Sequence, residues 1–180
     1  MDTIFENEWD EDSTDPRDYL AQFVPLTLHW YSMPTEWFAS VNVQPGLGPE
    51  MSTQECTCLL TIATILLNIG GTEVVVPKDD PPSIQAANVL MGDTMDATNL
   101  VVIQGKSKRS EKNCSELWLN NPHSYRLVRG YVLNGHGIWK SHMWLLDNQD
   151  HIVETTAPGT LYRGRVLSDE EVKRFLKSNW

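Results

Sequence analysis

Residues 125–156 read YRLVRGYVLNGHGIWKSHMWLLDNQDHIVETT, and this stretch decides the fold. It holds three runs rich in β-branched and aromatic residues, 125–133, 138–146 and 151–156, which are separated by short turn-forming segments. Runs of this length joined by short turns are typical of antiparallel strands. We therefore predict an antiparallel sheet in the C-terminal part of the chain.

Helix signals stand on both sides of this sheet. Residues 114–120 form a short helical stretch that ends at the Asn121-Pro122 turn. After the sheet, Ser168 with Glu171 makes a capping box, in which each residue satisfies a backbone N–H of the other. The capping box predicts a closing helix at the end of the chain.

A second capping box, Ser52 with Glu55, lies farther upstream and predicts a helix over about residues 53–68. The segment that follows alternates β-rich and helix-favouring runs, with turn residues between them. It predicts, in order, a strand over 72–76, a helix that Ser83 caps and that runs through Met91, and a strand over 99–103. Helices and strands together predict an α+β fold.

The length and the charge distribution predict one domain with a tail. A chain of 180 residues is long enough for one buried core, and a hydrophobic share of 41% is that of a globular protein. Residues 1–18 are rich in Asp and Glu and hold Arg17 as their one base. Like charges without apolar residues cannot offset the entropy of ordering. We predict an acidic disordered tail over 1–18 and a single domain over 19–180.

The net charge of −10 argues against a nucleic-acid partner, because such binding needs Lys and Arg to displace phosphate counterions. One short basic run interrupts the acidic chain. We interpret it as a solvated loop, with a phosphate or RNA contact as the alternative. The run consists of Lys106, Lys108, Arg109 and Lys112.

Hydropathy and cysteine usage favour a soluble cytoplasmic protein. The apolar run 58–67 is far shorter than the roughly 20 residues that span a bilayer, so we expect no membrane partner. Three cysteines, an odd number, fit a reducing compartment better than a disulfide framework. Cys56 and Cys58 have no second Cys or His pair to complete a zinc site. We expect neither a metal nor a cofactor.

Cys114 is the candidate nucleophile. A reactive thiol needs a lowered pKa, a base within hydrogen-bond reach and a third group that orients the base. If the helix begins at Cys114, its unpaired backbone N–H groups and its dipole favour the thiolate and can form an oxyanion hole. The alternative is that Cys114 is an inert core residue, as most free cysteines are.

His142 and Glu154 are the candidate base and orienting acid. If Asp147-Asn148-Gln149 is a three-residue hairpin loop, His142 pairs with Glu154 on the same face of the sheet. A carboxylate opposite an imidazole can hold its tautomer and stabilise its protonated form. His136, in the Gly-His-Gly segment, is the rival base, although that segment favours a turn.

The order of four segments resembles a family of small papain-like or transglutaminase-like proteins found in bacteria and phages. The resemblance covers residues 113–180. It implies a papain-like or transglutaminase-like core in which the nucleophile lies at a helix N-terminus and an antiparallel sheet carries the base and the acid. The segments are NCSELWLNNP, YRLVRGYV, SHMWLLDNQDHIVETT and LYRGRVLSDEEVKRFL.

The same resemblance implies that Cys114 is the nucleophile, His142 the base and Glu154 the orienting acid. The chain departs from the family pattern in two ways. First, Glu154-Thr155 stands where the family has Asp, often followed by Pro. Second, papain-like enzymes have a Gln a few residues before the nucleophile that completes the oxyanion hole, whereas the nearest upstream Gln here is Gln104, ten residues before Cys114. We therefore expect the neighbouring Asn113 to serve as the oxyanion or orienting group.

These features predict a cysteine-dependent hydrolase or acyltransferase that cleaves an amide, peptide or thioester bond through an acyl-enzyme. A peptide or protein is the expected substrate. The alternative is a catalytically inactive protein-interaction module, such as a regulator or a phage or viral protein that binds a host partner. A buried Cys114, or a His142 imidazole that faces away from it, favours the alternative.

Overall fold

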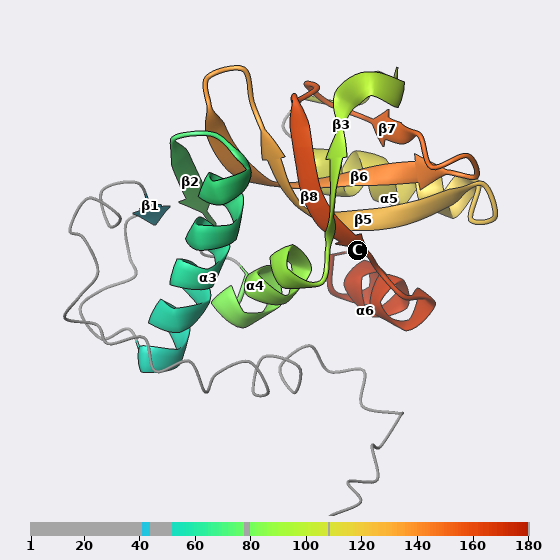
Figure 1. Ribbon diagram of the computed structural model, residues 1–180. Coiled ribbons are helices and arrows are strands. Elements are labelled where there is room, and N and C mark those ends of the chain that lie inside the picture. Colours follow the sequence, from blue (N-terminus) through green and yellow to red (C-terminus); the bar gives the residue numbers. More distant parts are fainter. Residues whose placement is uncertain (1–40, 44–51, 78–79, 108, 180) are drawn as a thin grey trace, which may run out of the picture.

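The computed structural model of the chain describes residues 41–43, 52–77, 80–107 and 109–179. The acidic tail predicted over 1–18 and the aromatic segment over 19–40 lie outside the described residues. Within them the fold is α+β (Figure 1). The elements, in chain order, are β1 (Val41–Val43), α3 (Thr53–Ile69), β2 (Glu73–Val76), α4 (Pro82–Leu90), β3 (Asp93–Asp96), the 3₁₀ turn η2 (Ala97–Asn99), β4 (Leu100–Val102), α5 (Ser110–Asn120), β5 (Tyr125–Leu133), β6 (Ile138–Asp147), β7 (Ile152–Glu154), β8 (Leu161–Val166) and α6 (Asp169–Asn179).

The strands form one curled sheet, and Figure 1 shows it bent into a half-barrel. Its main path runs β1-β2-β6-β5-β8-β3, and β7 joins the later part of β6 and carries β4 on its outer side. The long hairpin β5–β6 lies at the centre and pairs from Tyr125 with Asp147 to Leu133 with Trp139. The predicted antiparallel sheet is therefore present, with the boundaries of the hairpin nearly as expected.

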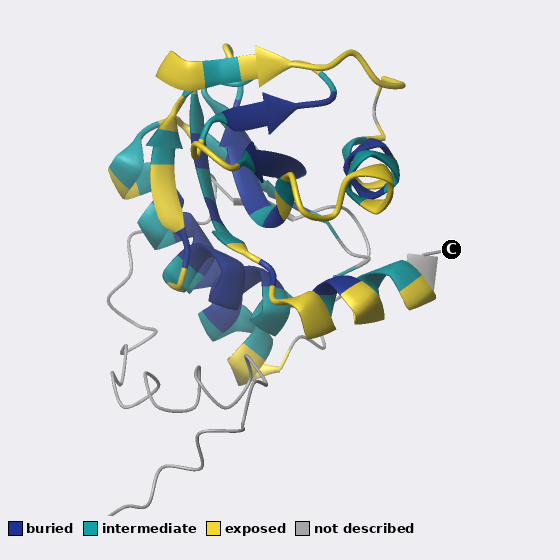
Figure 2. Ribbon diagram, turned by 90° about the vertical axis from the view of Figure 1, so that its right-hand side faces the viewer, coloured by how far each residue is buried: buried dark blue, intermediate teal, exposed yellow. Residues whose placement is uncertain are grey.

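The helices cover one face of this sheet. Successive residues of a strand point to opposite faces, and on the helix side Tyr131, Leu133 and Trp139 pack against α3 and α4. Farther along the same face, Leu127, Met143, Leu145 and Val153 pack with α5 and α6. The core on this face is therefore formed where strands and helices meet, and Figure 2 shows the buried strands beside the partly exposed helices.

The opposite face is the inside of the half-barrel. It is filled by Trp144 and Tyr162, which pack with Val128, Val132, Leu146 and Ile152. The chain from β3 through η2 to β4 runs from one end of the sheet to the other and lays Met95, Ala97 and Leu100 against this cluster. The inside of the half-barrel is thus a second small core.

Two predicted features of the region are wrong. Helix α5 begins at Ser110 rather than at Cys114, so Cys114 lies inside the helix. The hairpin between β6 and β7 pairs Leu146 with Ile152 rather than with Asp150. Its loop is longer because the Asp147 side chain accepts hydrogen bonds from the N–H groups of Gln149 and His151. The shift is of two residues, so each side chain keeps its predicted face.

Strands β3 and β8 were not predicted. β8 reads LYRGRV, and the charged Arg163 and Arg165 stand where a buried strand would carry apolar residues, so the usual strand pattern is absent. They bind on the helix side: Arg163 donates to the carbonyl of Val89, and Arg165 pairs with Glu171. β3 reads DTMD and is mostly exposed, so pairing with β8 rather than burial defines it.

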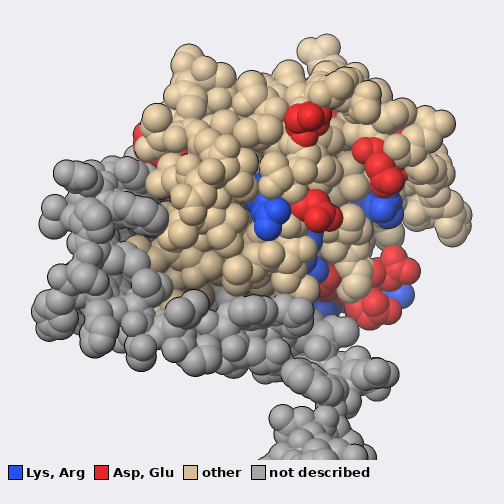
Figure 3. Space-filling model, in the orientation of Figure 1, with Lys and Arg blue, Asp and Glu red and all other residues tan. Residues whose placement is uncertain are grey.

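The surface seen in Figure 3 carries acidic and basic side chains beside one another, without a large patch of one sign. Among the helices of the described residues, none is long and apolar enough to cross a membrane. In the same part of the chain, no group of three His, Cys, Asp or Glu side chains is arranged to hold a metal ion.

Candidate functional site

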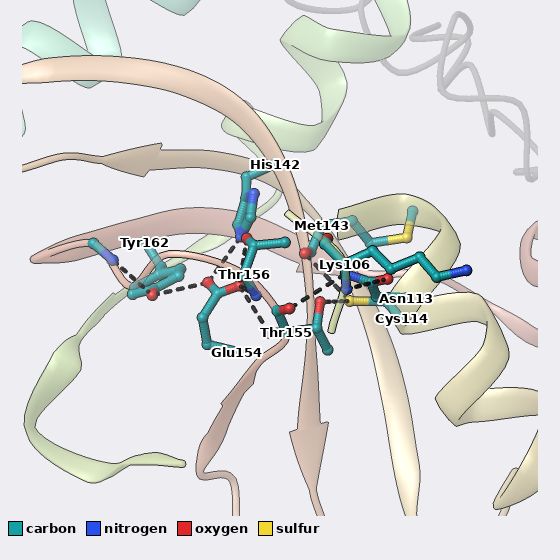
Figure 4. Close-up of polar contacts among 10 residues, drawn as sticks. Lys106, Asn113, Cys114, His142, Met143, Glu154, Thr155, Thr156 and Tyr162 are labelled. Carbon is teal, nitrogen blue, oxygen red and sulfur yellow. Dashed lines mark hydrogen bonds and ion pairs between the residues drawn. The ribbon is translucent and has the colours of Figure 1, made fainter. Parts of the chain in front are cut away.

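Glu154 is the centre of the most connected polar cluster inside the half-barrel (Figure 4). Its side chain is fully buried. Oε1 accepts hydrogen bonds from the N–H groups of Thr155 and Thr156, both at 2.8 Å, and from the Thr156 hydroxyl at 3.0 Å. Oε2 lies 2.8 Å from His142 Nε2 and accepts a bond from the Tyr162 hydroxyl at 3.1 Å. The carboxylate is fully partnered.

These bonds keep the carboxylate ionised. Burial by itself raises the pKa of Glu154, but the hydrogen bond and charge of His142, followed by the Thr156 contacts, outweigh it and hold the pKa below its usual value. An ionised carboxylate can only accept hydrogen bonds. His142 therefore carries a proton on Nε2, the nitrogen that faces Glu154.

The His142 side chain lies beside aromatic rings and opposite glycines on the neighbouring strands. Its ring stacks near Trp144, with centroids 6.3 Å apart, and its side chain is 9% exposed. Gly130 on β5 is its cross-strand partner, and Gly164 on β8 follows in the same row. A Cβ on Gly130 would lie 2.1 Å from the carbonyl oxygen of Arg163, so this row requires glycine.

Tyr162 completes the cluster. Its hydroxyl accepts a hydrogen bond from the N–H of Gly159 at 3.0 Å and donates to Glu154, and burial raises its pKa far above the usual value. The chain therefore runs from Gly159 through Tyr162 and Glu154 to His142. Such a chain orients an imidazole in the way that a base requires.

Cys114 lies on the other side of the sheet. It packs in the helix-side core with Met143 and Leu145, whereas His142 lies near Trp144 on the inside of the half-barrel. Cys114 Sγ donates to the carbonyl oxygen of Met143 at 3.3 Å and lies 3.4 Å from the Thr155 hydroxyl. It is fully buried, and burial raises its pKa to about 12. A thiol with this pKa is almost wholly in its protonated form at neutral pH, and the thiolate is the nucleophilic form.

Asn113 fixes the loop that follows β4. Its amide nitrogen donates to the carbonyls of Lys106 and Thr155 at 2.8 and 3.2 Å, and its amide oxygen accepts the N–H of Lys106 at 3.2 Å. Its backbone N–H donates to Arg109 within the helix. The side-chain amide and the backbone N–H of Asn113 are both used by these bonds. In this arrangement Asn113 therefore has no N–H left to donate to an oxyanion, the role predicted for it.

The structure thus brings together two of the predicted site residues and leaves two elsewhere. His142 and Glu154 form a buried pair, and Cys114 and Asn113 lie on the helix side. Among the described residues no hydrogen bond joins Cys114 to His142. The rival base His136 lies exposed in the turn between β5 and β6.

Sequence reasoning missed the polar partners of Glu154. The residue types of Tyr162, Trp144 and Thr156 are equally common in a packed sheet, so they do not by themselves assign these residues to the site. The signal that points to Tyr162 is the Tyr-x-Gly spacing of residues 162–164, in which Gly164 clears the space beside the Trp144 ring. A residue's hydrogen-bond partner across strands depends on register, which local sequence does not fix.

Acid is expected to weaken this cluster. The pKa of Glu154 lies below its unfolded value of 4.5, so its contribution to stability is complete above that value and is lost as the pH falls through the folded pKa. We expect the difference in unfolding free energy between wild type and Glu154→Gln to shrink as the pH falls below about 4.5. Urea titrations at each pH measure it, and a difference that grows on acidification contradicts this account.

Comparisons with protein families, with curated proteins and with solved structures found no match to this chain.

Proposed function

We propose that this chain is a protein-interaction module and that Cys114 is a structural residue of its scaffold. The papain-like or transglutaminase-like resemblance then concerns the scaffold and not the activity. The observation that carries this proposal is the position of Cys114, which is fully buried on the sheet face opposite His142.

The environment of the thiol supports a structural role. Removal from water destabilises a thiolate. The S–H group has an acceptor in the Met143 carbonyl and a second neighbour in Thr155, so the neutral thiol is satisfied where it is. Catalysis would require both a charged sulfur in this core and a base that reaches it, and the imidazole of His142 is bonded to Glu154 on the other face.

An exposed apolar edge supports the binding role. The exposed large hydrophobic side chains include three consecutive ones, Val101 at 43%, Val102 at 52% and Ile103 at 37%. They belong to β4 and the residue after it, at the outer side of the sheet. Exposed apolar side chains along a strand at the edge of a sheet favour the binding of another protein.

The second candidate function is the cysteine-dependent hydrolase or acyltransferase. The observation that favours it is the buried contact of 2.8 Å between His142 Nε2 and Glu154 Oε2, which is the arrangement that orients a catalytic imidazole. In this function Cys114 attacks a carbonyl after His142 removes its proton. It requires a rearrangement that brings the thiol to the imidazole.

Thiol labelling separates the two functions. We expect iodoacetamide to label partly exposed Cys56 faster than buried Cys58 and Cys114 in the folded protein, and to label Cys114 only when urea unfolds the chain. Peptide mass spectrometry at a series of pH values assigns each site. Both Cys56 and Cys58 have raised pKa values, chiefly from burial, so neither competes at low pH.

The informative variant is His142→Gln, with Cys58→Ala as the matched core control. If Cys114 in the native wild type labels well below a thiol's usual pKa of about 8.5, and loses that reactivity in His142→Gln, the interaction-module proposal fails and the hydrolase stands. Labelling that is slow and indifferent to His142 supports the module.

A further inference from the structure

Strand β4 forms an open edge of the sheet. Among the described strands it pairs only with β7, in parallel, with Val101 opposite Val153 and Val102 opposite Glu154. The ladder continues past the strand, because Ile103 donates its N–H to the Glu154 carbonyl and Gly105 donates to that of Thr155. Backbone groups of a strand alternate in direction. Those of Val102 and Gln104 therefore face away from β7.

This edge lacks the features that normally block pairing. Residues 100–105 read LVVIQG, with neither a charge nor a proline. The edge on the other side, β3, reads DTMD and presents Asp93 and Asp96. Charged side chains on an edge strand prevent addition of a further strand, whereas an exposed apolar edge accepts one. Within the described part of the chain, the contrast indicates that β4 is the edge that can accept a further strand.

Basic side chains stand at the C-terminal end of this edge. Lys106 and Arg109 are both exposed, and neither forms an ion pair with another described residue. The two hydrogen bonds between the Lys106 backbone and the Asn113 side chain fix where this end of the edge lies. Because the whole chain has a net charge of −10, these two bases distinguish this end of β4 from most of the protein. They attract an acidic segment and steer its approach.

We propose that the β4 edge, defined as residues 100–106 with Arg109, binds an extended acidic segment of a partner protein as an added antiparallel strand. The partner segment places β-branched residues beside Val101, Val102 and Ile103, and its N-terminal end carries the acidic residues that meet Lys106 and Arg109. Main-chain hydrogen bonds to Val102 supply affinity, and the charges set the direction. This inference rests on the proposed role as an interaction module and names the class of its partner.

The probe is a pair of fluorescent peptides of the same composition, Glu-Glu-Thr-Val-Thr-Val-Thr and its reverse, Thr-Val-Thr-Val-Thr-Glu-Glu. Fluorescence anisotropy against the full chain measures both affinities. An antiparallel strand with the acids first meets the basic end of β4, so we expect this peptide to bind at least about tenfold more tightly than the reverse, with an advantage that falls as salt is added.

Two variants test the contacts. Val102→Pro removes an outward N–H that makes no bond to β7, which an edge strand tolerates. Lys106→Glu with Arg109→Glu reverses the local charge. Each is expected to weaken the first peptide by about tenfold or more. The matched control is Lys173→Glu with Lys177→Glu on α6, two exposed bases replaced with the same change in net charge and no expected effect.

The outcomes separate this inference from the proposed function. Equal binding of both peptides, no binding of either at millimolar concentration, or binding that survives Val102→Pro overturns the β4 assignment. Self-association of the wild type that Val102→Pro abolishes, seen by sedimentation, shows that a second copy occupies the edge and also overturns it. None of these results alters the thiol labelling, whereas a reactive Cys114 that depends on His142 overturns the interaction module itself.

Discussion

Glu154→Ala is expected to lower the free energy of unfolding by about 3 to 5 kcal/mol, the cost of removing the shared carboxylate acceptor of a buried hydrogen-bond network. The methyl group leaves the Thr155 and Thr156 N–H groups, the Tyr162 hydroxyl and His142 Nε2 without their acceptor. Each of these donors is inside the half-barrel, away from water, so leaving it without an acceptor costs its desolvation free energy. Urea unfolding followed by tryptophan fluorescence measures the loss.

Two further variants locate the origin of this effect. Glu154→Gln keeps Oε1 as an acceptor, and the His142 imidazole and the Tyr162 hydroxyl can turn to accept from its amide, so the loss is expected to be less than half of that in Glu154→Ala. Glu116→Gln removes an exposed carboxylate that lies 3.9 Å from Lys112 and is expected to change stability by less than about 0.5 kcal/mol. Equal losses in Glu154→Ala and Glu116→Gln would show that the cluster is not a centre of stability.

Gly130→Ala is expected to lower the free energy of unfolding by at least about 3 kcal/mol, at the upper end for overpacking. An added Cβ would lie 2.1 Å from the Arg163 carbonyl oxygen and 2.5 Å from the Gly164 Cα. Both atoms belong to the backbone of β8, which cannot move without breaking its pairing with β5. Thermal and urea unfolding measure the loss.

Gly135→Ala is the matched control for this substitution. Gly135 lies in the turn between β5 and β6, and a Cβ there meets no other atom within 4 Å. The same change in composition is therefore expected to leave stability within about 0.5 kcal/mol of the wild type. A Gly130→Ala protein as stable as Gly135→Ala would mean that β8 does not approach β5 as closely as described.

Local signals predicted most of the elements. The Ser52 and Ser168 boxes are formed, with Ser52 Oγ accepting from Glu55 and Ser168 Oγ accepting from Glu171. Both boxes act within four residues, so the sequence pattern contains the whole interaction. The start of α5 was predicted too late, because no capping side chain marks it: its N-cap is Arg109 and makes no side-chain cap bond.

Contacts between distant strands could not be predicted in the same way. The face shared by His142 and Glu154 was correct even though the hairpin register was displaced, since an even shift preserves the face. The side of the sheet that α5 covers was not contained in any local pattern, and it decides that Cys114 meets Met143 rather than His142. One helix placement therefore changes the chemistry expected of the thiol.

The sheet order has a consequence for the order in which the protein folds as it is synthesised. β2 pairs with β6, Glu73 lying opposite Ile138, and β3 pairs with β8, Asp93 lying opposite Gly164. β2 and β3 therefore leave the ribosome well before β6 and β8, the strands that join them to the rest of the sheet. Contacts so far apart along the chain slow folding, and unpaired strands are exposed to aggregation in the meantime. The β5–β6 hairpin, made of neighbouring residues, is the natural nucleus onto which the earlier half of the chain docks.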